Sequence, residues 1–79
     1  MDRKELVAQV LECVATVYNK DVEELSENTN IKEELGGASI LMVGLVSEIE
    51  NELDVLVSLP EASACKTLGE LIDKVEELM

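Results

Sequence analysis

The sequence predicts an all-α fold, a small four-helix bundle with three main helices, one short helix and a long loop between the first and second helices. In three segments apolar residues recur at three- and four-residue steps, which is typical of helices that bury one face. The chain is 47% apolar but only 1% aromatic, so the core is expected to be aliphatic. We expect residues 1–79 to form one domain, which buries only about 60% of its unfolded surface and leaves no room for an enclosed active site.

The first helix is predicted over residues 3–18. Asp2 is followed three residues later by Glu5, a spacing that resembles a capping box. Asn19 is expected to end the helix. The apolar residues that define its buried face are Leu6, Val7, Val10, Leu11, Val14, Val17 and Tyr18.

Residues 20–38 form a long polar connection. A connection of this length needs anchors in a compact domain, and four apolar residues are expected to pin it to the core. These are Val22, Leu25, Ile31 and Leu35. Asn30 and Glu33 favour a single helical turn within it.

The second main helix is predicted from Ser39 to about Leu53, with Ser39 and Val43 at the edge of its buried stripe. The core-facing residues are Met42, Leu45, Val46, Ile49 and Leu53. The residues expected to point away from the core are Ile40, Gly44, Ser47 and Asn51, with Leu41 on the opposite edge. The first turns of this helix therefore present an apolar or neutral surface beside Ser39, and charge returns only at Glu48.

The remaining segments complete the bundle. Val55-Leu56-Val57 resembles a strand but has no second strand to pair with, so we expect an extended linker packed on the core. Pro60 suits the start of a short helix over residues 61–65. Residues 67–70 form a capping box ahead of a last helix at about residues 68–78.

Charge and composition exclude several classes of function. The net charge is −12, from 18 acidic and 6 basic residues, which argues against binding nucleic acid or an anionic membrane and favours partners with basic patches. No stretch is long and apolar enough to cross a bilayer, and no signal peptide is evident, so we expect a cytoplasmic protein. Histidine is absent, and Cys13 and Cys65 lack a metal-like spacing, so we expect no metal site and two small core cysteines.

Ser39 is the strongest candidate for chemistry. It follows Gly36-Gly37 and opens a helix, where free N–H groups and the helix dipole favour a phosphate. A phosphodiester on its hydroxyl would be stabilised there. The alternative is a plain N-cap, in which the hydroxyl accepts a hydrogen bond from the first helical turn.

The chain as a whole resembles the acyl carrier protein family over nearly its full length. The shared features include the long first helix, the loop anchored by Ile31, and Leu35-Gly36 ahead of Ser39. They continue through the apolar second helix, the acidic segment at residues 50–54 and the last helix from Thr67. In that family the serine carries a 4′-phosphopantetheine arm whose thiol holds acyl groups as thioesters. The resemblance implies that Ser39 is the attachment site and that the chain is a carrier and not an enzyme.

The resemblance also implies partners. A phosphopantetheinyl transferase would load Ser39 from coenzyme A with magnesium, and acyl-transferring or condensing enzymes of fatty acid or polyketide synthesis would then use a monomeric carrier. The residues expected to meet these partners are Gly37, Ala38, Ile40, Leu41, Val43, Gly44 and Glu48. Ala38 stands where the family has an acid that aids the transferase, and the first turns of the helix lack the family's acids. We therefore expect docking through apolar contact.

Three further points concern cargo and alternatives. Gly36-Gly37-x-Ser39 also resembles the motif of peptidyl carrier domains, which keeps an aminoacyl cargo open. A helical interaction module, in which Ser39 is only a cap, is the alternative from another class. A long acyl chain is expected to lie in a slim slot lined by Met42, Val46, Ile49 and Cys65.

Overall fold

A computed structural model describes residues 1–36 and 39–79, without the side chain of Ser39. The described residues form five α-helices, one 3₁₀ turn and no strand, which confirms the predicted all-α class. Three of the helices are long. In chain order the elements are α1 (Arg3–Tyr18), η1 (Val22–Glu24), α2 (Ile31–Glu34), α3 (Ser39–Leu53), α4 (Leu59–Ser63) and α5 (Leu68–Leu78).

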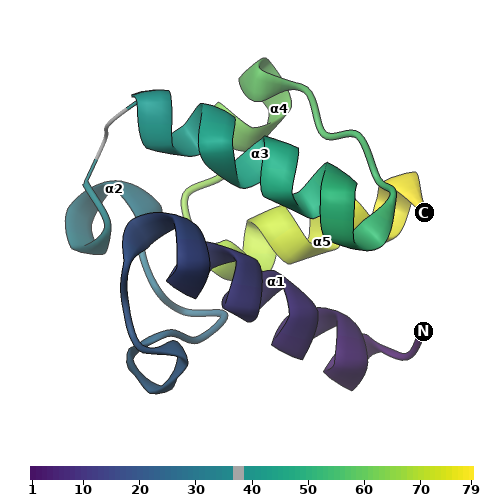
Figure 1. The fold of residues 1–79 in the computed structure, drawn as a ribbon, viewed down its shortest axis with the longest axis horizontal. Coiled ribbons are helices and arrows are strands. Elements are labelled where there is room, and N and C mark those ends of the chain that lie inside the picture. Colours follow the sequence, from purple (N-terminus) through teal and green to yellow (C-terminus); the bar gives the residue numbers. More distant parts are fainter. Residues whose placement is uncertain (37–38) are drawn as a thin grey trace.

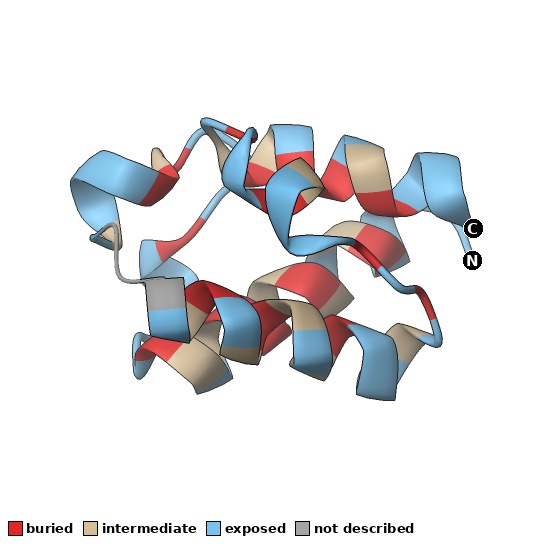
Figure 2. Cartoon of the chain, turned by 90° about the horizontal axis from the view of Figure 1, so that it is seen from above, coloured by how far each residue is buried: buried red, intermediate tan, exposed pale blue. Residues whose placement is uncertain are grey.

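The long helices enclose one aliphatic core. Helix α1 packs against both α3 and α5, and the short α4 contacts α3 and α5 (Figure 1). The buried residues lie on the sides of the helices that face one another (Figure 2). Both chain termini lie at one end of the bundle, and α3 begins at the other end (Figure 1).

The predicted ends of the first and last helices are confirmed. The Asp2 carboxylate accepts a 2.8 Å hydrogen bond from the Glu5 backbone N–H, and Asn19 closes α1 in the left-handed conformation with φ of 55°. The Thr67 hydroxyl accepts a 3.2 Å bond from the Glu70 N–H at the start of α5.

The predicted bounds of the short helix are wrong by two residues at each end. Helix α4 begins at Leu59, because Ser58 is the N-cap and its hydroxyl accepts a 3.3 Å bond from the Glu61 N–H. Pro60 then lies within the first turn, where a missing N–H costs nothing. The linker before α4 is extended, and Val55 and Val57 are buried in the core as expected.

The long connection is anchored differently from the prediction. Leu25 and Ile31 are buried and Leu35 is half-buried, but Val22 is 42% exposed, so its predicted role as an anchor is wrong. Backbone hydrogen bonds to the start of α5 contribute the missing attachment. They join Leu68 N–H to Thr29 O at 3.0 Å, Ile31 N–H to Lys66 O at 2.9 Å, and Gly69 N–H to Glu27 O at 2.8 Å.

An ion cluster fastens the same region to α1. The Arg3 guanidinium lies 2.7 Å from a Glu27 carboxylate oxygen, 2.8 Å from Asp73 and 3.1 Å from Glu76. These carboxylates come from the long connection and from α5. One cation at the start of α1 thus joins three segments that are far apart in the sequence.

Candidate modification and docking site

The site is built at the start of α3. The helix begins at Ser39, as predicted, and runs for 15 residues. Gly36 precedes it with φ of +83°, a left-handed conformation that glycine adopts without strain, and its surroundings are open. Gly37, Ala38 and the Ser39 side chain lie outside the described part of the chain, so the expectations placed on them remain predictions.

Helix α2 holds the chain in place ahead of Gly36. Its capping is reciprocal: the Asn30 side chain accepts a 2.9 Å bond from the Glu33 N–H, and the Glu34 carboxylate accepts a 2.7 Å bond from the Asn30 N–H. The backbone bond from Ile31 N–H to Lys66 O ties this turn to the segment before α5. The chain therefore enters the start of α3 from a fixed point.

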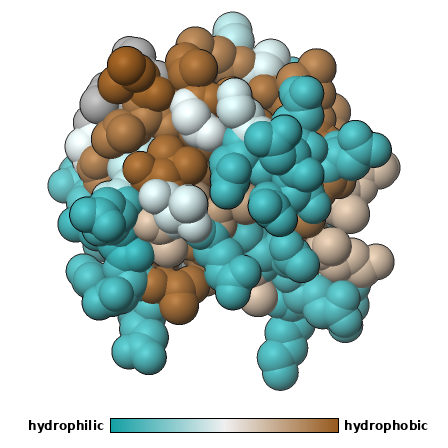
Figure 3. Space-filling view, viewed as in Figure 1, coloured by the Kyte–Doolittle hydropathy of each residue, from teal (hydrophilic) through white to brown (hydrophobic). Residues whose placement is uncertain are grey.

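The first turns of α3 expose apolar side chains. Ile40 is 80% exposed and Val43 is 46% exposed, whereas Leu41 is half-buried against the core. The first turn contains no acidic residue. Apolar surface gathers over the start of α3 beside the grey, undescribed atoms (Figure 3). The predicted apolar surface near Ser39 is thus present.

Gly44 does not point away from the bundle, and this expectation is wrong. A Cβ atom built on Gly44 would lie 3.4 Å from Cγ1 of Val17, a residue of α1. The residue is half-buried. Position 44 therefore faces α1, and any contact with a partner must use the outer backbone of this turn.

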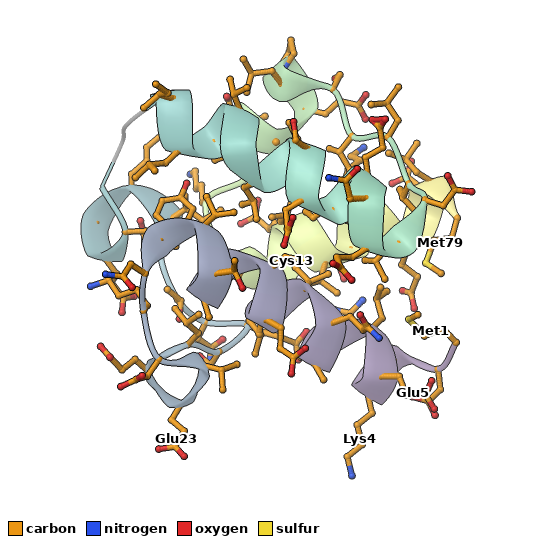
Figure 4. All side chains as sticks on the ribbon, viewed as in Figure 1. Met1, Lys4, Glu5, Cys13, Glu23 and Met79 are labelled. Carbon is orange, nitrogen blue, oxygen red and sulfur yellow. The ribbon has the colours of Figure 1, made fainter. Side chains whose placement is uncertain are left out.

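Glu48 also lies toward α1. Glu48 is one of six residues that line a notch of about 120 Å³ between α1 and α3. The lining residues are Gln9, Glu12, Cys13, Thr16, Glu48 and Glu52, and Cys13 is labelled between the two helices in Figure 4. Sequence reasoning missed this notch, although Gln9, Cys13 and Thr16 share one face of α1 at helical spacing.

The notch has a distinct electrostatic character. Burial, followed by the negative charges of Glu48, Glu52 and Glu12, raises the pKa of the Cys13 thiol to about 11. The thiol is therefore neutral at physiological pH and a poor nucleophile. Among the described residues, no group of three or more acids or cysteines is placed to hold a metal ion.

The residues expected to line a cargo slot lie in or against the core. Met42, Ile49 and Cys65 are buried, and Val46 is half-buried against them. The Cys65 thiol donates a 3.4 Å hydrogen bond to Glu61 O within the short α4 region. Burial raises the pKa of this thiol as well, so it too is protonated near neutral pH.

Comparison with known proteins identifies the class. A family model described as the phosphopantetheine attachment site matches residues 8–75, which includes most of the bundle and the start of α3. The chain belongs to this family of phosphopantetheine-bearing carriers. Its members carry groups and do not catalyse reactions, so the chain is a carrier with 4′-phosphopantetheine as its prosthetic group.

Curated relatives share one name. A protein of an Exiguobacterium species named "Acyl carrier protein" is 26% identical over 76 residues, which is 96% of each chain. One from Saccharopolyspora erythraea is 28% identical over 79 residues, covering 100% of this chain and 83% of the relative. One from a Sulfurovum species is 30% identical over 73 residues, covering 92% of this chain and 97% of the relative.

The described helices carry no candidate membrane span. None of them is both long enough and apolar enough to cross a bilayer.

Proposed function

We propose that residues 1–79 act as one acyl carrier domain that holds acyl groups as thioesters on a phosphopantetheine arm attached to Ser39. The observation that carries this proposal is the position of Ser39 as the first residue of α3 in a chain of the phosphopantetheine attachment family. Gly36 ahead of it leaves open space for an incoming enzyme. The curated relatives named "Acyl carrier protein" support an acyl cargo over an aminoacyl one.

The start of α3 suits a phosphodiester for two reasons. The first N–H groups of the helix have no partners within it, and the aligned peptide dipoles place a partial positive charge there. The first turn carries no carboxylate that would repel the phosphate. An anion on the Ser39 oxygen is therefore stabilised by the backbone that follows it.

Loading of the arm is a transfer reaction at one oxygen. In a transferase complex with magnesium, the Ser39 hydroxyl would form a new bond to the phosphorus of the phosphopantetheine portion of coenzyme A. The bond to the remaining nucleotide breaks, adenosine 3′,5′-bisphosphate leaves, and the hydroxyl proton passes to a base of the transferase. When bound, the arm supplies the thiol that holds the cargo.

The docking surface proposed for the transferase and for acyl-transferring or condensing enzymes surrounds Ser39. Its apolar centre is Ile40 and Val43, with Leu41 at the edge. The proposed surface also includes Gly37, Ala38, Gly44 and Glu48. Gly44 would contribute its backbone, and Glu48 lies at the border with α1. A monomer in the reducing cytoplasm fits the two free, buried cysteines and the high net charge.

The deciding experiment is intact-mass measurement after incubation with coenzyme A, magnesium and a broad-specificity phosphopantetheinyl transferase. We expect the mass to rise by one phosphopantetheine. The Ser39→Ala variant is expected to gain nothing, and Ser47→Ala, which removes an exposed hydroxyl on the same helix, is expected to load normally. Loading that persists in Ser39→Ala, or that fails in the parent chain with several transferases, would contradict the proposal.

A further inference from the structure

The linker between α3 and α4 exposes one large apolar side chain. Val55 and Val57 are 5% and 1% exposed, whereas Leu56 between them is 71% exposed. Among the large apolar residues that the structure describes, only Ile40 is more exposed. Burial that alternates with each residue is the mark of an extended chain with one face on the core.

Both ends of this linker are fixed. Asp54 ends α3 in the left-handed conformation with φ of 57°, and its N–H donates a 2.9 Å bond to Glu50 O. Ser58, with φ of −69° and ψ of 153°, caps α4. Val55 and Val57 hold the centre in the core. The extended conformation is therefore preformed, which lowers the entropic cost of binding to it.

The outer edge of the linker presents free backbone groups. In an extended chain, residues two apart direct their N–H and C=O groups to the same edge. Leu56 and Ser58, which share one edge, are exposed residues, whereas Val55 and Val57, which share the other edge, are buried residues. Within residues 1–36 and 39–79, no hydrogen bond joins the Leu56 N–H, the Leu56 C=O or the Ser58 N–H to another residue. Such an edge is a template for an added strand.

The carboxylates near this edge favour a partner with basic side chains. Glu52 and Asp54 precede it and are exposed, whereas the Glu61 carboxylate in α4 already accepts a 2.9 Å bond from the Ser58 hydroxyl and lies 3.9 Å from the Lys74 ammonium. A second copy of the chain would add a net charge of −12 to this acidic surface and is disfavoured. Basic side chains on the incoming strand match these carboxylates, and apolar ones match Leu56.

We propose that Val55–Ser58 is a second docking surface, on which an extended segment of a partner protein, with alternating apolar and basic side chains, pairs as a β-strand. This surface lies on the linker at the C-terminal end of α3, whereas Ser39 lies at the N-terminal end of that helix. The pairing does not require phosphopantetheine on Ser39. A short ladder of this kind binds weakly, which suits a protein that must release each partner.

The test uses the full ¹⁵N-labelled chain and a six-residue peptide of alternating valine and lysine. We expect chemical-shift changes centred on residues 54–58 and slower hydrogen exchange at the Leu56 and Ser58 amides. The same peptide with every backbone N–H methylated keeps its charges and side chains but cannot form the ladder. We expect it to bind at least fivefold more weakly.

Two variants complete the design. Leu56→Gln, which removes the apolar side chain without adding a charge, is expected to weaken peptide binding at least fivefold, whereas Leu78→Gln, which changes another exposed leucine, is expected to leave it unchanged. Both sites are exposed, and circular dichroism checks that both variants fold. Three outcomes would overturn the proposal. One is the absence of chemical-shift changes at millimolar peptide, and another is equal binding of the methylated peptide. The third is hydrogen-exchange protection of the Leu56 amide that rises with protein concentration in the absence of peptide. Loading of Ser39 is measured separately by mass, so failure here is distinguishable from failure of the carrier proposal.

Discussion

The hypothesis of apolar docking depends most on the side chain of Ile40. Leaving a large apolar side chain in water forgoes about 1.5–3 kcal/mol of burial free energy, and Ile40 is 80% exposed. A partner that covers this side chain recovers part of that energy. The absence of acids in the first turn of α3 removes the ion pairs that would otherwise guide docking there.

Replacing Ile40 should therefore impair docking and not folding. We expect Ile40→Glu to lower kcat/KM for loading of Ser39 by about tenfold, because about 1.4 kcal/mol of apolar contact is lost in the complex. Leu78→Glu, at an exposed site on α5, is the matched control and should leave the rate unchanged. Steady-state kinetics with the transferase measure both variants, and equal rates for Ile40→Glu and the parent chain would refute apolar docking at this residue.

Gly44 gives a second test at the residue scale. A glycine inside a helix costs roughly 0.5–1 kcal/mol relative to alanine, and the added Cβ would meet Val17 at 3.4 Å, which is close to ordinary contact. We expect Gly44→Ala to raise the free energy of unfolding by about 0.5 kcal/mol in urea titrations. A lower free energy of unfolding would show that α1 and α3 cannot move apart by the few tenths of an ångström that the added methyl group needs.

At the scale of elements, the attachment of the long connection to α5 is the main determinant of where α2 lies. Three backbone hydrogen bonds and the Arg3 ion cluster hold it. The ion pairs are partly exposed and individually weak. The backbone bonds are specific in direction, and one of them requires a glycine at position 69.

A side chain at that position would break the attachment. A Cβ atom on Gly69 would lie 2.9 Å from the backbone oxygen of Glu27, which is too close for the connection to stay in place. We expect Gly69→Ala to lower the free energy of unfolding by about 1–3 kcal/mol, opposite in sign to Gly44→Ala. Urea denaturation compares the two, and unchanged stability of Gly69→Ala would mean that the connection shifts without loss.

The three long helices were predictable from local patterns, whereas the bounds of α4 and the attachment of the long connection were not. The bounds of α1, α3 and α5 follow from apolar spacing and caps that lie within a few residues of each other. The predicted start of α4 relied on Pro60 alone, whereas the N-cap at Ser58, which the prediction missed, begins the helix two residues earlier. The bond from Gly69 to Glu27 spans a long stretch of sequence and leaves no periodic signature.

The candidate site was predictable in part, because the exposure of residues on α3 follows from the local apolar pattern. The wheel of α3 places Ile40 away from the core and Val43 at the edge of the buried stripe, and both side chains are exposed. It also placed Gly44 away from the core, and this was wrong because α1 packs against that position through Val17. Packing between helices depends on side-chain size in both partners, which a single-helix pattern does not contain.

At the scale of the whole molecule, stability should fall in alkaline solution. Burial, with the nearby carboxylates Glu48, Glu52 and Glu12, raises the pKa of Cys13 from 9.0 to about 11, and burial also raises the pKa of Tyr18 and Cys65. The folded state holds these protons more tightly than the unfolded chain does. For Cys13, the contribution to stability is complete below pH 9 and is lost as the pH rises through 11.

The alkaline loss can be assigned to one thiol. The Cys13 shift alone corresponds to roughly 2–3 kcal/mol between pH 9 and 11. We expect urea titrations of the parent chain to show a decline over this range, and Cys13→Ala to decline less steeply from its own value at pH 7. Parallel curves for the two proteins would rule out the thiol as the source.

The placement of both termini at the end of the bundle away from the start of α3 has a practical consequence (Figure 1). A chip, a bead or a fluorescent fusion can be joined to either end without standing between Ser39 and an approaching enzyme. Of the two, the C-terminus is the better handle, because Asp2 caps α1 and Arg3 makes ion pairs close to the other end.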